Sequence, residues 1–121
     1  MKENIALIRE VFHRLEISVA ENEAVEMLQK IGLEDIAERR QRECSSIQRF
    51  YVMLIRTMMS DEKKIIIRLP FSIVHSLLDI NDLVMHIRKL DSKKDIIILD
   101  TIVHKSYYDK ISDQKVVIDA L

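Results

Sequence analysis

The chain has 121 residues, of which 48% are hydrophobic, and its formal net charge is −1 at pH 7. This length predicts a single domain over residues 1–121, and the apolar content suffices for a buried core, which excludes a disordered regulator as the first choice. A domain that binds DNA or membranes through bulk charge is usually basic, so any contact with nucleic acid requires a local basic patch.

Cysteine and glycine usage excludes further classes. The lone cysteine, Cys44, forms neither an internal disulfide nor a cysteine-based metal site. One glycine is too few for a phosphate-binding loop or a dinucleotide-binding fingerprint. Charges interrupt the first apolar run, MKENIALIRE, which argues against a secretory signal, and no apolar run reaches the roughly 18 residues of a spanning helix. We therefore expect a cytoplasmic protein without membrane contact.

The first half of the chain predicts helices. Apolar residues recur at helical spacing over residues 3–16, which indicates an amphipathic helix. A second helix is expected over residues 20–31, with Ser18 as its N-cap and Gly32 at its C-terminus. A third helical stretch is expected over residues 34–59. Its apolar stripe consists of Ile47, Tyr51, Leu54 and Met58.

The second half predicts strands on both sides of a helix. KKIIIRL, residues 63–69, is rich in isoleucine and is closed by Pro70, which is typical of a strand. Residues 71–90 return to helical periodicity. DIIILDTIV, residues 95–103, predicts a second strand that is buried on both faces. KVVIDAL, residues 115–121, predicts either a third strand or a short helix. We therefore expect an α+β fold with a strand–helix–strand crossover.

One face of the helix predicted over residues 71–90 is polar. It carries, within an arc of about 60°, His75, Asp79, Asp82 and His86. Zinc usually takes three or four ligands, and the residue four away from each histidine is an aspartate, so we expect no metal site. An ordinary solvated face explains the pattern, with a partner-contact face as the alternative.

An arginine row is expected if residues 34–59 form one continuous helix. Its members then lie within about 100° of one another, opposite the apolar stripe, and are Arg39, Arg42, Arg49 and Arg56. Such a row can contact phosphates or an acidic protein surface. The alternative is an ordinary solvated basic face, diluted by Glu38 and Glu43.

No arrangement of residues indicates catalysis. Cys44 has no histidine near it in sequence, and the serines that follow it lie in no nucleophile elbow. Carboxylates of the second half show neither calcium-loop nor phosphatase-like spacing; these are Asp95, Asp100 and Asp109. Aromatic residues near Lys105 and Lys110 can stack on bases or close the edge of a core; these are Tyr107 and Tyr108. We expect neither an enzyme nor a cofactor.

LLDINDLVMHIR, residues 77–88, resembles a stretch of the flagellar master-regulator D-subunit family. In that family a leucine-containing helix runs into an Asn-x-Leu-Val-x-His-x-Arg pattern. The matching residues here are Asp79, Asn81, Leu83, Val84, His86 and Arg88, and Leu69-Pro70 and Ser60-Asp61-Glu62 are compatible upstream. Met85 stands where some members carry a cysteine. The resemblance implies an almost entirely helical homodimer that binds a second regulatory subunit and acts on promoter DNA through that complex.

These observations predict a small cytoplasmic regulatory protein that works as a homodimer. In the first reading it is a transcription regulator that contacts duplex DNA through the arginine row. In the alternative it is a protein-interaction module, such as an adaptor, a secretion chaperone or an inhibitor, without DNA contact. The resemblance adds an alternative fold, an all-α dimer.

Overall fold

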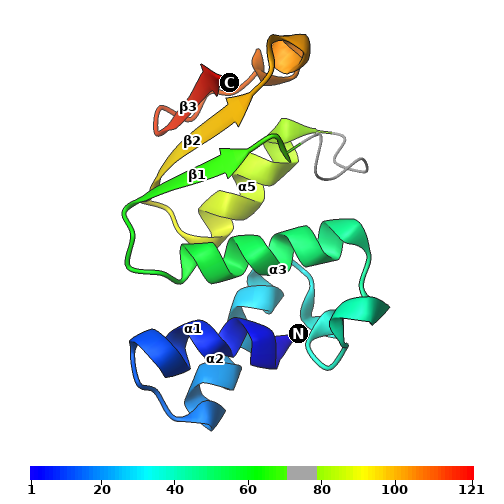
Figure 1. The fold of residues 1–121 in the computed structure, drawn as a ribbon, viewed down its shortest axis with the longest axis vertical. Helices are drawn as coiled ribbons and strands as arrows, with labels where there is room; N and C mark the ends of the chain where they lie inside the picture. Colours follow the sequence, from blue (N-terminus) through cyan, green and yellow to red (C-terminus); the bar gives the residue numbers. More distant parts are fainter. Residues whose placement is uncertain (71–78) are drawn as a thin grey trace. The chain divides into compact units, whose positions relative to one another are not determined.

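The computed structural model describes residues 1–70 and 79–121, which form two units, Met1–Asp61 and Glu62–Leu121 (Figure 1). The first unit is helical and the second contains a three-stranded sheet, so the predicted α+β class is confirmed. The all-α alternative is wrong, because the isoleucine- and valine-rich runs of the second half pair into that sheet. The single domain stays a prediction. In the described ranges, no helix has the length and apolarity needed to cross a bilayer.

Three α-helices and two short 3-10 segments build the first unit. They are α1 (Lys2–Phe12), α2 (Ile17–Lys30), η1 (Glu34–Ile36), η2 (Gln41–Glu43) and α3 (Ser46–Met58). Helix α1 packs against both α2 and α3. The fully buried side chains of this unit include Ile5, Ala6, Ala20, Ala24, Leu28 and Ile55. Three of these are alanines, which permit a close approach of the helix backbones.

The first two helices differ from their predicted bounds. Helix α1 ends at Phe12 instead of residue 16, because Arg14 adopts a left-handed conformation with φ of 54°. Ser18 is not the N-cap of the second helix; it lies in the first turn of α2, whose N-cap is Glu16. The C-terminal prediction is confirmed at Gly32, whose φ of 71° is easily adopted only by glycine. There the N–H of Leu33 donates to the carbonyl oxygen five residues back, at 2.9 Å, which closes a Schellman motif.

The predicted continuous helix over residues 34–59 was wrong in its first half. The chain forms η1 and η2 there, and α3 begins only at Ser46. The Ser45 hydroxyl accepts a hydrogen bond from the Gln48 N–H at 3.2 Å, and the Ser45 N–H donates to Gln48 Oε1 at 2.8 Å. This reciprocal capping box starts a helix inside an apparently continuous pattern. Cys44, just before it, is extended with φ of −107° and ψ of 148°.

The second unit is a parallel sheet in the order β1-β2-β3, with its connections between the strands. Its elements are β1 (Lys64–Arg68), α5 (Ile80–Leu90), β2 (Asp95–Asp100), η3 (Ile102–Tyr108) and β3 (Val116–Ala120). The strand over residues 63–69 is confirmed, and the open question at residues 115–121 is answered by β3. The strand over residues 95–103 ends earlier, at Asp100, where η3 follows. Of the predicted helix over residues 71–90, the part before residue 79 lies outside the described residues.

One face of the sheet is covered and the other is not. Parallel connections are right-handed, and both here step in the same direction, so they lie on the same face of the sheet. The side chains on that face are buried, among them Ile65, Ile67, Ile96 and Ile98. Figure 1 shows α5 behind the sheet on this side. Ile97 and Leu99 on the other face are only partly buried, so the prediction that this strand is buried on both faces was wrong.

The capping box at the start of α3 gives a stability prediction. We expect Ser45→Ala to lower the free energy of unfolding by about 1 kcal/mol, because the Gln48 N–H loses its acceptor. Urea unfolding followed by circular dichroism measures the change. Ser46→Ala, one residue further into the helix, is the matched control and should change stability by less than about 0.5 kcal/mol. Equal effects of the two substitutions would contradict the capping role.

Candidate functional site

Two of the four arginines of the predicted row lie on α3 and are bound within their own unit. The Arg49 Nη1 donates to the carbonyl oxygen of Cys44 at 2.7 Å, which ties the side chain to the start of the helix. The Arg56 Nη1 donates to Asn4 Oδ1 of α1 at 2.9 Å. Both side chains therefore contribute to the packing of the first unit.

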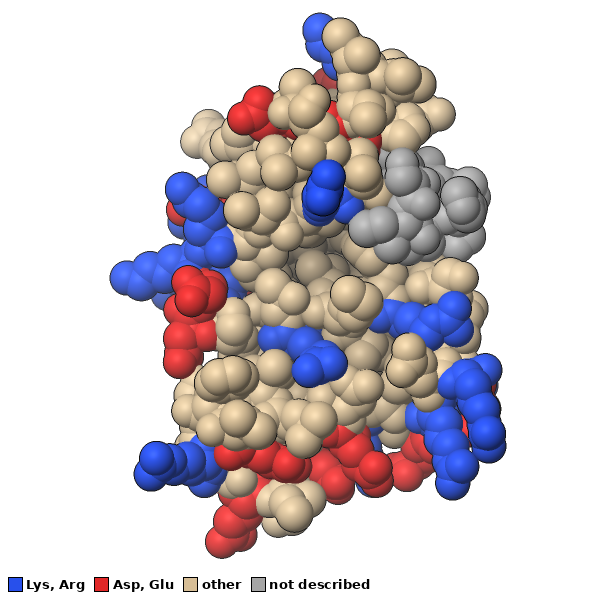
Figure 2. Space-filling model, viewed as in Figure 1, with Lys and Arg blue, Asp and Glu red and all other residues tan. Residues whose placement is uncertain are grey.

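The other two arginines lie outside α3. Arg39 Nη2 is 3.7 Å from Asp35 Oδ2, and Arg42 is exposed within η2. The row required one continuous helix, and because η1, η2 and α3 are separate elements, the four arginines do not share one helix face. On the face seen in Figure 2, Lys and Arg side chains lie among Asp and Glu side chains without forming one broad basic field. Nucleic-acid contact by these residues stays a prediction.

The polar face of α5 divides into different local roles. Asp79 is the N-cap of α5, and its carboxylate accepts the backbone N–H two residues on at 2.8 Å. Asp82 is exposed in the first turn. Burial lowers the pKa of His86 below its ordinary value, and the positive charge of Lys89 acts in the same direction. His75 lies outside the described residues. Within the described ranges, no three His, Cys, Asp or Glu side chains are placed to hold a metal ion. Partner contact by this face stays a prediction.

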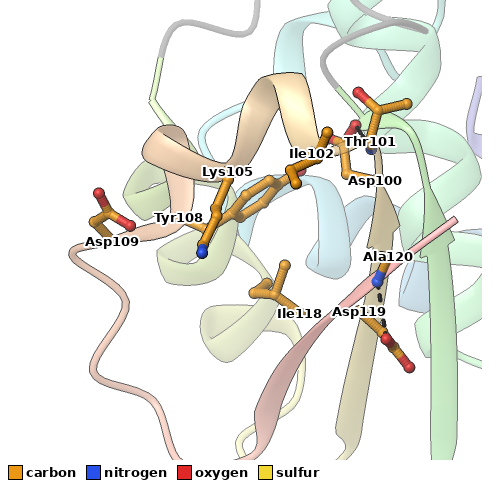
Figure 3. A pocket seen from close by; sticks show the side chains of 9 residues that line it. All are labelled: Asp100, Thr101, Ile102, Lys105, Tyr108, Asp109, Ile118, Asp119 and Ala120. Atoms are coloured by element: carbon orange, nitrogen blue, oxygen red, sulfur yellow. Dashed lines mark hydrogen bonds between the residues drawn. The ribbon is translucent and has the colours of Figure 1, made fainter.

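A cleft of about 410 Å³ lies at the carboxyl edge of the sheet (Figure 3). The ends of β2 and β3 and the η3 segment build it. It is lined by Asp100, Thr101, Ile102, Lys105, Tyr108, Asp109, Ile118, Asp119 and Ala120. In open α/β sheets this edge is where ligands bind, because the connections that leave the strand ends provide variable side chains around a rigid base.

The buried carboxylate of Asp100 is the anchor of this cleft. Only 2% of its surface is exposed. The Tyr108 hydroxyl donates to Oδ2, the backbone N–H of Thr101 donates to Oδ1 at 2.7 Å, and His104 Nδ1 lies 2.8 Å from the same oxygen. Burial alone would raise the pKa of Asp100, but these bonds outweigh it and hold the pKa below its ordinary value.

The phenol that faces this carboxylate stays protonated. Burial, together with the hydrogen bond to Asp100 and its negative charge, raises the pKa of Tyr108 far above the ordinary value of a tyrosine. The hydroxyl is therefore a permanent donor that ties η3 to the end of β2. Three polar groups of the same unit bind the Asp100 carboxylate. Asp100 therefore holds η3 against the end of β2 and so fixes the position of the cleft wall.

The rim of the cleft combines exposed apolar side chains with charges of both signs. Ile102 is 79% exposed and Val103 is 80% exposed, and Tyr107 nearby is more than half exposed. The Tyr107 ring stacks on His104 with ring centroids 5.3 Å apart. Charged side chains around the opening are Lys105, Asp109 and Asp119. Figure 3 shows Tyr108 and Ile118 facing the interior of the cleft, with Lys105 beside the Tyr108 ring. Such an arrangement can receive an apolar group that carries a charge at its edge.

Sequence reasoning considered the members of this cluster singly and missed their combination. The sequence pattern presents Asp100 as a carboxylate without metal-site spacing and Tyr108 as a stacking or core-edge residue, and it does not single out His104. The signal that links them is a spacing of four residues from Asp100 to His104 and four more to Tyr108, directly after a strand. That spacing aligns side chains in a regular α-helix. Here Asp100 ends β2 while His104 and Tyr108 lie in the 3-10 segment η3, so the cluster depends also on the turn that joins the two elements.

Comparison with known proteins gave no assignment: no family model, no curated protein and no solved structure matches the chain.

The Asp100 cluster predicts a dependence of stability on pH. We expect Asp100→Asn to destabilise the second unit by about 1–3 kcal/mol at pH 7, because its amide cannot accept both side-chain donors. The folded-state pKa of Asp100 is lowered, so the stability it contributes is present above about pH 4 and is lost as the pH falls through the folded value. The difference between the two proteins should therefore shrink below about pH 4.

Chemical unfolding between about pH 2.5 and 7 measures this difference. Asp109→Asn, which changes an exposed aspartate of the same cleft, is the control and should cost less than about 0.5 kcal/mol. A constant difference across the whole range would contradict the anchoring role of the ionised carboxylate.

Proposed function

We propose that the chain is a small regulatory protein that acts in the cytoplasm by binding another protein, and that the cleft at the carboxyl edge of the sheet receives this partner. The observation that carries the proposal is the exposure of Ile102, Val103 and Tyr107 beside a cleft with an apolar floor. Single exposed apolar residues are ordinary, but a group of them next to a cavity is typical of an interaction site.

The chemistry of the cleft defines the partner. Its volume lies within the range of about 300–1,000 Å³ that is usual for binding pockets, and its floor includes Ile118 and the ring of Tyr108. Asp109 and Asp119 at the opening outnumber Lys105. The fitting partner is a protein segment that inserts one bulky apolar side chain and carries a basic residue next to it. A second regulatory subunit, as the flagellar-regulator resemblance implies, is one such partner.

A displayed peptide library tests this proposal. We expect selection on the full chain to yield peptides that combine a bulky apolar residue with an adjacent Lys or Arg. Ile102→Asp, which places a charge at the rim, should weaken binding of these peptides at least about tenfold. Isothermal titration calorimetry with synthetic peptides measures the affinities.

Met85→Asp is the matched control, because Met85 is a half-exposed apolar residue on α5 and should leave affinity unchanged within about twofold. Selected peptides that bind equally well to Ile102→Asp, or a selection that yields no binder, would remove the cleft as the partner site.

Nucleic-acid contact is the second candidate function. The observation that favours it is the exposure of Arg40 and Arg42, which lie two residues apart at η2. In Figure 2 a group of Lys and Arg side chains lies around this segment. Arginine contacts phosphate oxygens through its planar guanidinium, so a short exposed segment of this kind suits a nucleic-acid backbone.

Salt-dependent binding decides this second candidate. We expect the full chain to bind a duplex of about 20 base pairs weakly at about 50 mM salt, with an affinity that falls steeply as salt rises. The double change Arg40→Ala and Arg42→Ala should reduce the slope of log affinity against log salt by about 1–2. Lys30→Ala, another exposed cation of the first unit, is the control. Fluorescence anisotropy measures the binding, and its absence at low salt would remove this candidate.

A further inference from the structure

The uncovered side of the sheet in the second unit has a defined apolar centre. The register places Ile66, Ile97 and Val117 in one row across the three strands. Ile66 is 61% exposed and Val117 is 55% exposed, and Ile97 between them is partly buried. We call the side chains of this side the open face. Its members are Lys64, Ile66, Arg68, Asp95, Ile97, Leu99, Val117 and Asp119.

An open face of this kind is unusual for a parallel sheet. Parallel sheets are normally covered on both faces, because their connections distribute helices to both sides. Here the described helical parts of both connections, α5 and η3, lie on one side, so neither covers the row of Ile66, Ile97 and Val117. β-branched side chains in three adjacent strands, with Ile66 and Val117 more than half exposed, form an apolar surface that suits a second layer.

The charges on the open face are complementary under rotation. In the row next to the apolar one, the register places Arg68 on β1, Leu99 on β2 and Asp119 on β3. Arg68 and Asp119 are two strands apart, about 10 Å between backbones, and within the described residues neither is part of an ion pair. One edge of the row is therefore positive and the other edge is negative.

We propose that a second copy of the chain packs against the open face, related by a two-fold axis that runs parallel to the strands along β2. This rotation exchanges β1 and β3 between the copies. Ile66 then faces Val117 of the second copy. Ile97 faces Ile97 of the second copy, and Leu99 faces Leu99 of the second copy. Arg68 faces Asp119 of the second copy, and the symmetry produces this opposite-charge pair twice.

The other two-fold arrangement of the same face is less favourable. An axis perpendicular to the strands places Arg68 opposite Lys64 and Asp95 opposite Leu99, so it joins like charges and covers a carboxylate with an apolar side chain. With the axis parallel to the strands, the two Asp95 carboxylates approach each other, but Lys64 lies beside Asp95 in each sheet and offsets their charge. Lys115 precedes β3 in the row of Lys64 and Asp95, so the same axis places it opposite Lys64 of the second copy; its ammonium donates to the carbonyl oxygen of Lys93 at 2.9 Å.

The size of the open face sets the expected strength of the dimer. Three short strands offer less than the roughly 800 Å² per partner of a standard stable interface, so the association should be weak and depend on concentration. The inference does not rest on the proposed partner cleft. Of the open face, Asp119 also lines the cleft, whereas Ile66, Ile97 and Val117 do not, so substitutions in the apolar row can remove the dimer without changing the partner site.

Charge exchange tests the dimer. We expect sedimentation velocity of the full chain between about 5 and 500 µM to show a monomer–dimer equilibrium. Arg68→Asp alone and Asp119→Arg alone should each raise the dissociation constant at least about tenfold, because each places like charges opposite each other twice. The double change should restore the dissociation constant to within about threefold of the original.

A mixture of the two single variants gives the sharpest readout. Arg68→Asp from one copy meets Asp119→Arg from the other, and the remaining native pair is intact, so the mixture should associate more strongly than either variant alone. Val117→Asp, at the apolar row and outside the cleft lining, should also abolish association. Lys89→Asp on α5 is the charge-change control and should leave the equilibrium unchanged. Circular dichroism confirms that each variant is folded.

The proposal is overturned if the original chain is monomeric at every concentration, or if the dimer survives Val117→Asp. It is also overturned if the mixture of single variants associates no better than the variants alone, because the facing of Arg68 and Asp119 would then be absent. Asp119 also lines the cleft, so peptide binding is compared in Val117→Asp, whose substituted residue does not line it. A Val117→Asp protein that is monomeric and still binds the peptides distinguishes failure of the dimer from failure of the proposed function.

Discussion

The handedness of two chain connections determines which side of the sheet in the second unit is covered and which side is exposed. Both connections step from one strand to the next in the same direction, so both lie on one side of the sheet. The covered side receives α5 and η3 and holds the buried isoleucines of β1 and β2. The same constraint places η3 over the carboxyl ends of β2 and β3, where it forms the cleft, and leaves the row through Ile97 exposed. One topological rule thus accounts for both surfaces proposed to bind other protein chains.

Periodicity in the sequence predicted the fold class and most elements, and local capping chemistry caused the errors. The isoleucine-rich runs identify β1 and β2 because short runs of β-branched residues favour strands over helices. The helix predicted over residues 34–59 failed because Ser45 and Gln48 form a capping box inside a pattern that keeps helical spacing. Hydrophobic spacing records which side of a segment is apolar, and it does not record where the backbone turns between two helical pieces.

The candidate site was less predictable than the fold. The arginine row depended on an unbroken helix, so the interruption before α3 removed its geometric basis. The Asp100 cluster, Asp100 with His104 and Tyr108, combines residue types that are individually common. What makes it a candidate site is the burial of one carboxylate at a strand end. Burial at the end of a strand depends on what packs above it, here η3, and a single sequence gives no spacing rule for that packing. The exposure of the open face likewise follows from the hand and direction of the connections, which strand composition does not encode.

The strand register also bears on how the second unit folds. Pairing of β1 with β2 joins residues 31 positions apart, Lys64 and Asp95, whereas pairing of β2 with β3 joins Ile96 and Val116, 20 positions apart. The entropy of closing the two loops differs by only about 0.4 kcal/mol, which is less than thermal energy. Neither pairing is therefore favoured to form first on grounds of chain entropy. Whichever of the two pairings forms first includes β2, so contacts of β2 belong to the first step of sheet formation in either order.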